Sequence, residues 1–354
     1  MKDTRMIPAS RRTADSVPGP EVPPRTKRIF ITGATGFAGR HLIEELKARE
    51  RRGRRAARLE ITGTCYPERP DQCPGLTAGD SGVKLLSLDL RDAGGVAAAV
   101  AEAQPDRIFH LAAISQVRAS WAKRRETIET NILGTFHVFE AARMHTPSAR
   151  ILFVSSSDVY GRQNPGRMPL RETVRLSAAS PYGFTKISGE ALAGFYVRSE
   201  KLPIVIARPF THTGPGQSPD FVCSDWARQI AEIENGKPAV IKVGNLDVRR
   251  DYSDVRDVVR AYVSLIERGK PGQAYNICSG ESPSLRVILR MLTGFSGIRV
   301  GVEVDPGRFR KADIPLLAGS RAKITRETGW KPRFDLETTL RDLLEDWRRK
   351  IRPQ

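Results

Sequence analysis

The feature that most limits how this chain can fold is a regular alternation of apolar β-type runs with helical stretches, which begins at residue 28. The apolar runs lie at 28–32, 59–64, 83–88, 106–112, 150–155 and 203–207, and the helical stretches lie at 41–49, 93–103, 127–144 and 182–199. Such alternation predicts an α/β fold, a doubly wound parallel sheet with helices on both faces. The nearly continuous apolar runs agree, because strands of a parallel sheet are buried on both sides.

After about residue 209 the pattern becomes less regular. A turn-rich segment at 213–219 precedes shorter elements, with strands predicted at 240–243 and 274–278 and a helix at 284–293. A chain of 354 residues is also long for a single core. We therefore predict three parts: a disordered basic tail over 1–27, a first domain over 28–209, and a smaller mixed region over 210–350 that partly returns to the sheet.

A glycine-rich loop, Gly-Ala-Thr-Gly-Phe-Ala-Gly at 33–39, follows the first apolar run and opens a helix. Glycines allow the backbone to turn tightly and to approach a pyrophosphate, whose charge is met by amides at the helix N-terminus. The spacing is GxxGxxG instead of the common GxGxxG, and a glycine turn before a helix can be purely structural. Because the loop joins a strand to a helix near the start of the chain, we favour dinucleotide binding.

The residues after the second apolar run bear on which dinucleotide binds. An NAD site usually has an acidic residue there, which binds the ribose 2′-hydroxyl. Residues 63–66 contain none, and Glu68 lies beyond Pro67. Arg40 and Arg69 could instead pair with a 2′-phosphate. We therefore predict NADPH as the cofactor and leave NADH open.

The third apolar run ends at Asp89 and Leu90. At that strand end, Asp89 is placed to meet the adenine of a dinucleotide. The alternative is that Asp89 caps the next helix, but Asp92 is the better candidate for that cap.

The formal net charge of +18 first suggests an anionic partner, such as nucleic acid, lipid or a charged substrate. Half of the excess lies in residues 1–58, in the proline-rich tail and in an arginine cluster at 49–58 that suits a helix C-terminus. No zinc-finger, RNA-recognition or helix-turn-helix pattern accompanies these charges. A solvated basic face is therefore favoured over a nucleic-acid patch, and no nucleic-acid partner is predicted.

The cysteines and the hydropathy pattern indicate the compartment. Cys65, Cys73, Cys223 and Cys278 show no CxxC spacing, so neither a metal site nor a disulfide framework is predicted. No run of about 18 apolar residues occurs, so no membrane association is expected. The tail also lacks the apolar core of a secretory signal. We expect a reducing compartment and a cytoplasmic location.

Tyr182 and Lys186 are spaced YxxxK at the start of a predicted helix. Positions i and i+4 share one helix face, so the phenol and the ammonium can act at one place. The ammonium is expected to lower the phenol pKa and make Tyr182 a usable proton donor or acceptor. A hydroxyl from the serines at 155–157 could polarise a carbonyl. A lone YxxxK is common on helix faces, but its combination with the glycine loop is much more specific.

With these motifs in place, the sequence resembles the extended short-chain dehydrogenase/reductases that act on nucleotide sugars. The resemblance covers nearly all of residues 28–350. It rests on TGATGFAG (32–39), HLAA (110–113), NILGT (131–135), SSSDVYG (155–161), SPYGFTK (180–186) and RDYSDVRD (250–257). It implies a Rossmann-type domain that binds NAD(P) over 28–209 and a mainly substrate-binding, mixed C-terminal domain over 210–350.

The resemblance also implies roles for individual residues. Ser156, Tyr182 and Lys186 match a catalytic triad, in which Tyr182 protonates a C4 oxygen, Ser156 hydrogen-bonds it, and Lys186 holds the nicotinamide ribose. Asp158 matches the general base of dehydratases but could instead bind a sugar hydroxyl, and Asn131 matches a structural asparagine near a helix kink. The implied cofactor-binding residues are Gly33, Thr35, Gly36, Phe37, Ala38, Gly39, Arg40, Asp89, Leu90, Leu111, Ala112, Ala113, Tyr182 and Lys186.

The same resemblance implies that a GDP-sugar binds to the second region. Arg250 and Arg308 match positions that hold the diphosphate, which requires guanidinium partners. Arg249 and Arg310 are their neighbours and could equally lie on a solvated surface. The family pattern Phe-Asn-His reads Phe-Thr-His at 210–212, and threonine lacks the amide that contacts the sugar nucleotide. The implied substrate-binding residues are Ser157, Thr211, His212, Lys242, Arg250 and Arg308, with Asn245 beside Lys242 at the guanosine end.

Within the family, the stretches at 211–217, 241–262, 275–280 and 329–333 favour a reductase of a GDP-sugar. The implied reaction is NADPH-dependent reduction of the C4 keto group of GDP-4-dehydro-6-deoxy-D-mannose to GDP-D-rhamnose. A dehydratase or epimerase of the same fold is the alternative. The catalytic tyrosine and lysine are both present, which disfavours a cofactor sensor without catalysis. A homodimer is expected, because the helices at 127–144 and 182–199 commonly pair in this family.

Overall fold

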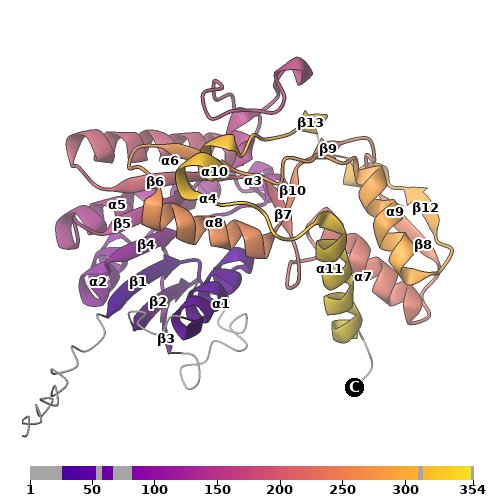
Figure 1. Cartoon of the computed structure of the whole chain (residues 1–354), viewed down its shortest axis with the longest axis horizontal. Coiled ribbons are helices and arrows are strands. Elements are labelled where there is room, and N and C mark those ends of the chain that lie inside the picture. The colour runs from indigo at the N-terminus through magenta and orange to yellow at the C-terminus, as the bar shows by residue number, and fades with distance from the viewer. Residues whose placement is uncertain (1–25, 53–57, 67–81, 310–313, 352–354) are drawn as a thin grey trace, which may run out of the picture.

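The computed structural model describes residues 26–52, 58–66, 82–309 and 314–351. Seven parallel strands form its central sheet, in the order β11-β6-β5-β4-β1-β2-β3 (Figure 1). The strands are β1 (Lys27–Thr32), β2 (Leu59–Cys65), β3 (Val83–Ser87), β4 (Arg107–His110), β5 (Arg150–Val154), β6 (Ile204–Pro209) and β11 (Ala274–Ile277). From β1 the chain builds outward in both directions, as in a Rossmann sheet, so the predicted fold class is confirmed.

Helices cover both faces of the sheet, because successive side chains of a strand point to opposite faces. Ile29 and Ile31 of β1 pack with one set of helices, whereas Phe30 packs with the other set. Full burial of such a side chain stabilises the fold by about 1.5–3 kcal/mol. The first set is α1 (Phe37–Arg52), α8 (Val255–Arg268) and α10 (Ala322–Thr328), and the second is α2 (Ala93–Ala103), α5 (Gly134–His145) and α6 (Pro181–Ser199).

A second, smaller unit lies beside the sheet and has a core of its own (Figure 1). Trp226, Ile230, Leu292 and Leu343 are buried in this core. Its elements are α7 (Val222–Glu234), β8 (Val240–Val243), α9 (Leu285–Ser296), β12 (Gly301–Val304) and α11 (Leu336–Ile351). Two pairs of short parallel strands lie between it and the sheet, namely β7 (Thr211–Thr213) with β10 (Tyr252–Asp254) and β9 (Arg249–Arg250) with β13 (Leu316–Leu317).

All six apolar runs of the first domain form strands whose ends lie within two residues of those predicted. The strand predicted at 274–278 does not stay in the second region, because it joins the main sheet as β11, next to β6. Helix α8 also returns to the sheet, where Val258 and Val259 pack in the same core as Leu42 of α1. An amphipathic pattern predicts that a helix buries one face, but it does not say against which surface.

The helix predicted over 127–144 is interrupted. Short helices α3 (Val117–Ala122) and α4 (Arg124–Ile128) lead into a π-helical turn, η2 (Glu129–Leu133), and α5 begins only at Gly134. Such π-turns are rare inside helices and are frequent at functional sites. The kink implied near Asn131 therefore lies in this turn.

Several predictions fall on residues outside the described part of the chain. They concern the tail over 1–25 and the side chains of Arg54, Arg55, Glu68, Arg69, Cys73 and Arg310. Among the helices that are described, none combines the length and the apolar composition that a membrane crossing requires.

Candidate active site

The loop that joins β1 to α1 requires glycine by its geometry. Gly33 has a φ of 71°, and a Cβ there would lie 2.9 Å from the Cα of Ala112, which follows β4. A Cβ on Gly39 would lie 2.3 Å from the carbonyl oxygen of Gly33. Neither position accommodates a side chain without a backbone shift. The loop therefore brings the backbone close to the sheet at the start of α1, as a pyrophosphate site requires.

The start of α1 also suits an anion. Its first turn contains no acidic residue, and Arg40 lies half-buried in it. Thr35 is half-buried and Gly36 is exposed, whereas Phe37 and Ala38 pack against the sheet core. An anion at this end would meet backbone amides and the positive end of the helix dipole, with no carboxylate in the first turn to compete. The loop residues therefore fit the dinucleotide that their sequence predicts.

Asp89, which is followed by the buried Leu90, does not cap a helix. Its carboxylate accepts hydrogen bonds from Nε and Nη2 of Arg91, and these bonds lower the pKa of Asp89. Nη2 of Arg91 also donates to the hydroxyl of Tyr66, which follows β2. The cap of α2 is Asp92, as the sequence favoured. Arg91 was not predicted as a site residue, and only the fold brings it to Tyr66.

A buried chain of hydrogen bonds holds the segment after β4. The hydroxyl of Thr32 contacts Nδ1 of His110 at 2.7 Å and accepts from the amide of Ala112 at 3.2 Å. Nε2 of His110 contacts the hydroxyl of Thr135 at 2.9 Å. Burial lowers the pKa of His110 to about 3, so the ring stays neutral. The predicted cofactor residues at 111–113 are thereby held beside the glycine loop.

Helix α6 begins in a way that presents its catalytic candidates. The Ser180 hydroxyl accepts a hydrogen bond from the amide of Gly183 at 3.1 Å, and Pro181 occupies the first turn, where its missing N–H costs nothing. Tyr182 therefore lies in the first turn of the helix. Lys186 follows one turn later on the same face.

Ser156, Tyr182 and Lys186 come together at the end of β5, and all three are buried. The hydroxyl of Ser156 interacts with the phenol of Tyr182 and acts to lower its pKa. Nζ of Lys186 lies 5.8 Å from the centre of the Tyr182 ring and donates to the carbonyl of Val154 at 2.8 Å. The structure therefore brings together a hydroxyl pair and an ammonium, a set that can polarise and protonate a carbonyl oxygen.

The pKa of Tyr182 is raised, whereas the sequence predicted that Lys186 would lower it. Burial raises the pKa of Tyr182, the charge of Asp158 raises it further, and the interaction with Ser156 opposes both. The ammonium of Lys186 donates instead to the carbonyl of Val154. The sequence showed the spacing of the two groups but not the burial that outweighs their attraction. Tyr182 is a neutral phenol at physiological pH, suited to donating a proton.

Lys186 should set the high-pH limit of activity. Burial lowers the pKa of Lys186 to about 8, opposed by the charge of Glu190. The ammonium is present below that pKa and is lost as the pH rises through it. We expect the rate to fall above about pH 8 in a pH–rate profile. In a Lys186→Arg variant that retains activity, this fall should disappear, because arginine stays charged. The same fall in that variant would contradict the assignment.

Asp158 lies directly beside Ser156. Ser156 caps the short 3-10 helix η3 (Ser157–Tyr160): its Oγ accepts from the amide of Asp158 at 3.1 Å and donates to Oδ2 of Asp158 at 3.3 Å. Ser157 is buried in the first turn of η3. The structure therefore places a carboxylate next to the hydroxyl pair, where a proton could be exchanged.

The π-turn η2 carries Asn131 to the loop after β4. Oδ1 of Asn131 accepts from the amide of Ile114 at 2.8 Å, and Nδ2 donates to the carbonyl of Ile114 and to the hydroxyl of Thr185. Thr185 immediately precedes Lys186 on α6. Asn131 thus connects the loop after β4 to the helix that carries the catalytic candidates.

His212 lies next to the cofactor loop, and Thr211 precedes it on β7. The ring of His212 stacks on Phe37, with 6.0 Å between centroids and 6° between planes. Burial lowers the pKa of His212, so its ring is neutral. Thr211 is half-buried on β7. The turn after β7 is tied to α1, because Nε2 of His41 contacts the carbonyl of Pro215 at 2.9 Å.

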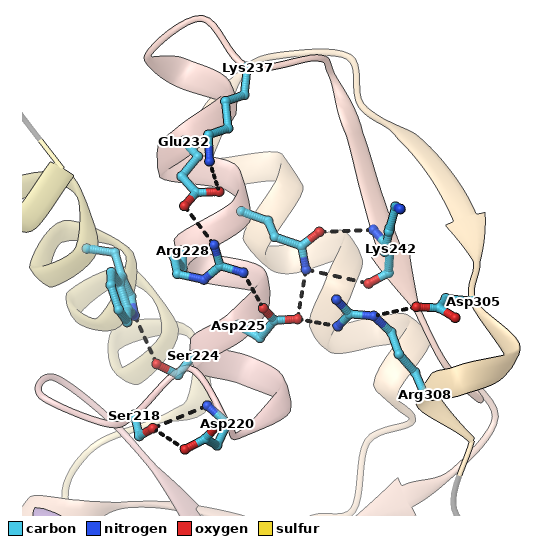
Figure 2. A network of polar contacts seen from close by, with 12 residues as sticks. Ser218, Asp220, Ser224, Asp225, Arg228, Glu232, Lys237, Lys242, Asp305 and Arg308 are labelled. Carbon is cyan, nitrogen blue, oxygen red and sulfur yellow. Dashed lines mark hydrogen bonds and ion pairs between the residues drawn. The ribbon is translucent and has the colours of Figure 1, made fainter.

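Arg308 and Lys242 lie in the second unit, within the polar network of Figure 2. Arg308 closes the short helix η5 (Pro306–Arg308), and its Nη1 lies 2.5 Å from Oδ2 of Asp225 on α7. Its Nε lies 3.3 Å from Oδ2 of Asp305. Lys242 is exposed on β8, and its amide donates to Gln229 at 3.0 Å. The sequence did not predict Asp225, which is 83 residues from Arg308.

Arg250 lies on β9, and its Nη1 donates to the carbonyl of Arg249 at 2.9 Å. Nε of Arg249 donates to the carbonyl of Ser282 at 2.9 Å. Asn245 accepts from the amide of Asp247 at 3.0 Å, in the turn that follows β8. These substrate candidates are therefore spread over segments of the second region and are not gathered on one element.

A buried ion pair behind the catalytic candidates was not predicted. Nη2 of Arg208, on β6, lies 2.6 Å from Oε2 of Glu190, and each side chain is only 7% exposed. Glu190 lies one turn after Lys186 on α6, and its Oε1 accepts from the hydroxyl of Ser155 at 2.6 Å. The sequence does show a glutamate four residues after the YxxxK lysine. Its ion-pair partner, Arg208, lies on another element and could not be identified from spacing.

The Rossmann sheet and the Ser–Tyr–Lys site define an NAD(P)-dependent enzyme of the nucleotide-sugar short-chain dehydrogenase/reductase class. The sequence profile of the GDP-mannose 4,6 dehydratase family matches residues 30–343, and the chain belongs to this family. The predicted resemblance is therefore confirmed.

Individual relatives have several different activities. The chain is 32% identical to the GDP-6-deoxy-D-mannose reductase of Pseudomonas aeruginosa, over 93% of this chain and 100% of that protein. The NADPH complex of RMD from Pseudomonas aeruginosa matches with a TM-score of 0.78 at 30% identity, covering 92% of this chain and 100% of that one. A putative epimerase from Burkholderia cenocepacia matches with a TM-score of 0.78 at 35% identity, covering 92% and 99%.

Proposed function

We propose that this protein uses NADPH to reduce the C4 keto group of GDP-4-dehydro-6-deoxy-D-mannose, giving GDP-D-rhamnose. The observation that carries the proposal is the burial of Ser156, Tyr182 and Lys186 together at the end of β5, with Nζ of Lys186 5.8 Å from the centre of the Tyr182 ring. The alignment over the full length of a GDP-6-deoxy-D-mannose reductase supports the choice of substrate.

Tyr182 is the proton donor in this proposal. Its raised pKa keeps the phenol protonated, so its oxygen can transfer a proton to the C4 oxygen as negative charge develops there. The hydroxyl of Ser156 turns from Asp158 to the same C4 oxygen and stabilises that charge. The ammonium of Lys186 stabilises the phenolate left on Tyr182 and holds the nicotinamide ribose.

The residues of the first domain fit NADPH, which supplies the hydride when it is bound. The amides of the loop at 33–39 hold the pyrophosphate, as the Cβ-free approach of Gly33 to Ala112 allows. Arg40 binds the 2′-phosphate, and residues 63–66 offer no carboxylate to a free 2′-hydroxyl. Asp89 lies at the adenosine end.

The second region binds the GDP-sugar in this proposal. Arg250 and Arg308 pair with the diphosphate, and Lys242 lies at the guanosine end. Thr211 and His212 contact the sugar, close to the cofactor loop, because His212 stacks on Phe37. Ser157, which is buried next to Ser156 in η3, completes the sugar contacts in this proposal.

A 4,6-dehydratase is the second candidate, and the carboxylate of Asp158 favours it. Asp158 lies within hydrogen-bond distance of Ser156, where a dehydratase needs a general base. The name of the matching family points in the same direction. A dehydratase returns the hydride to its substrate within one turnover, whereas a reductase consumes NADPH stoichiometrically.

An absorbance assay separates the two candidates. Purified protein, NADPH and the 4-keto sugar nucleotide should together lose nicotinamide absorbance in proportion to product. No loss of absorbance would overturn the reductase proposal. Conversion of GDP-mannose without added reductant would favour the dehydratase. Analysis of the product sugar then distinguishes rhamnose from its C4 epimer, 6-deoxy-talose.

We further propose that the protein forms a homodimer through η2, α5 and α6. Several large apolar side chains of these and adjoining elements are exposed, which is typical of an interaction surface. They are Ile128, Leu133, Phe136, Met144, Phe184 and Phe195.

Light scattering after gel filtration should give the mass of a dimer. A Leu133→Glu, Phe184→Glu variant should give the mass of a monomer, because a charge buried without a partner is costly. Exposed Val302 lies on β12, away from these helices, so Val302→Glu is the matched control and should remain a dimer. A monomeric wild-type protein would contradict the proposal.

A further inference from the structure

Asp225 is the centre of the polar network in the second unit (Figure 2). Its Oδ1 accepts from Nη2 of Arg228 at 2.8 Å, and its Oδ2 accepts from Nε2 of Gln229 at 2.8 Å and from Nη1 of Arg308 at 2.5 Å. The side chain of Asp225 is 11% exposed, whereas that of Arg308 is 34% exposed. The nearly buried carboxylate of Asp225 therefore holds the guanidinium of Arg308, which is still accessible to a ligand.

Arg308 lies on a different element from the other two partners of Asp225. Arg228 and Gln229 follow Asp225 by three and four positions on α7, so the helix itself keeps them in place. Arg308 belongs to η5, beyond β12. If Arg308 leaves, Asp225 keeps one charged and one amide donor, so no buried carboxylate is left unpaired. Arg308 is thus the partner that can be exchanged.

The charges around Arg308 are already largely balanced. Asp225 and Asp305 both contact the guanidinium of Arg308, and Arg228 is shared between Asp225 and Glu232. A diphosphate that approaches Arg308 meets a guanidinium whose charge is offset by two carboxylates. Phosphate and carboxylate oxygens use the same N–H groups of arginine, so the two anions compete.

We propose that Asp225 sets the affinity of the nucleotide end of the site, by holding Arg308 in an ion pair that the diphosphate of a nucleoside diphosphate must replace. This inference rests on the proposed function in one respect, the assignment of Arg308 to the diphosphate. Asp225 is a residue that acts through Arg308 and does not itself touch the ligand. Its charge makes binding of the nucleotide weaker than Arg308 alone would allow.

The test is calorimetric titration of the full-length protein with GDP. Asp225→Asn keeps the size of the side chain and an accepting oxygen but removes the charge. We expect the variant to bind GDP about three- to tenfold more tightly, the range for loss of a competing, partly exposed ion pair. A structural defect at this position would weaken binding, so a gain in affinity reports the competition itself. Asp225→Ser is a second variant with the same expectation.

Two further variants separate the ion pair from general charge effects. Glu232→Gln removes a carboxylate that contacts Arg228 and Lys237 but not Arg308, and should change GDP affinity by less than about twofold. Arg308→Ala should weaken GDP binding. Adding Asp225→Asn to Arg308→Ala should give no gain, because the competing partner is gone.

The outcomes distinguish this inference from the proposed function. If Arg308→Ala leaves GDP affinity unchanged, Arg308 does not bind the diphosphate, and the assignment in the proposed function fails. If Arg308→Ala weakens binding but Asp225→Asn does not strengthen it, only the present inference is overturned, and Asp225 then orients Arg308. An equal gain from Glu232→Gln would also overturn it, because the effect would not depend on contact with Arg308.

Discussion

A Tyr182→Phe variant should lose about a hundred- to ten-thousand-fold in turnover while it keeps its affinity for NADPH. Phenylalanine preserves the buried ring but lacks the hydroxyl whose raised pKa keeps it protonated. The C4 oxygen would still receive a hydrogen bond from Ser156, but the positioned proton donor would be gone. Steady-state oxidation of NADPH measures the first effect, and a fluorescence titration with NADPH measures the second.

The matched control is Tyr275→Phe. Tyr275 is another buried tyrosine, but it lies on β11, and its hydroxyl donates to Glu327 at 2.8 Å. Loss of that hydroxyl should affect stability and leave turnover largely intact. Unchanged turnover in Tyr182→Phe would remove the phenol from the proton transfer, whatever the control shows.

The parts of this protein that follow from local spacing were predictable from its sequence. The YxxxK spacing places Tyr182 and Lys186 on one helix face in both the prediction and the structure. The glycine spacing likewise predicted the tight loop in which Gly33 has a φ of 71°. In both cases the chemistry depends on residues only a few positions apart, so the helical period and glycine conformations are sufficient.

The parts that depend on burial or on distant partners were not predictable. Residue spacing does not show how deeply Tyr182 is buried, so the direction of its pKa shift was predicted wrongly. Asp225 and Arg308 are joined only because α7 and η5 pack in the same unit. A partial return of the chain to the sheet was predicted, but periodicity does not specify that β11 and α8 are the elements that make it.

The second large effect concerns stability and follows from the buried pair of Glu190 and Arg208. In an Arg208→Met variant, the carboxylate of Glu190 would remain buried, and the hydroxyl of Ser155 at 2.6 Å would be its remaining hydrogen-bond donor among the described residues. We expect the free energy of unfolding to fall by about 3–5 kcal/mol, because an unpaired buried charge is strongly destabilising. Urea unfolding followed by circular dichroism measures the change.

A double variant tests whether the unpaired charge of Glu190, and not the lost packing of Arg208, lowers the free energy of unfolding. A Glu190→Leu, Arg208→Met double variant removes both charges and should recover most of the stability, since an apolar pair of similar volume is often as stable as a buried ion pair. Arg341 and Glu337 form an exposed pair on α11, so Glu337→Gln should cost only about 0.3–0.5 kcal/mol. If the double variant is as unstable as Arg208→Met, the side-chain contacts and not the unpaired charge account for the loss. If Arg208→Met costs no more than Glu337→Gln, the pair does not stabilise the region that supports Ser156 and Lys186.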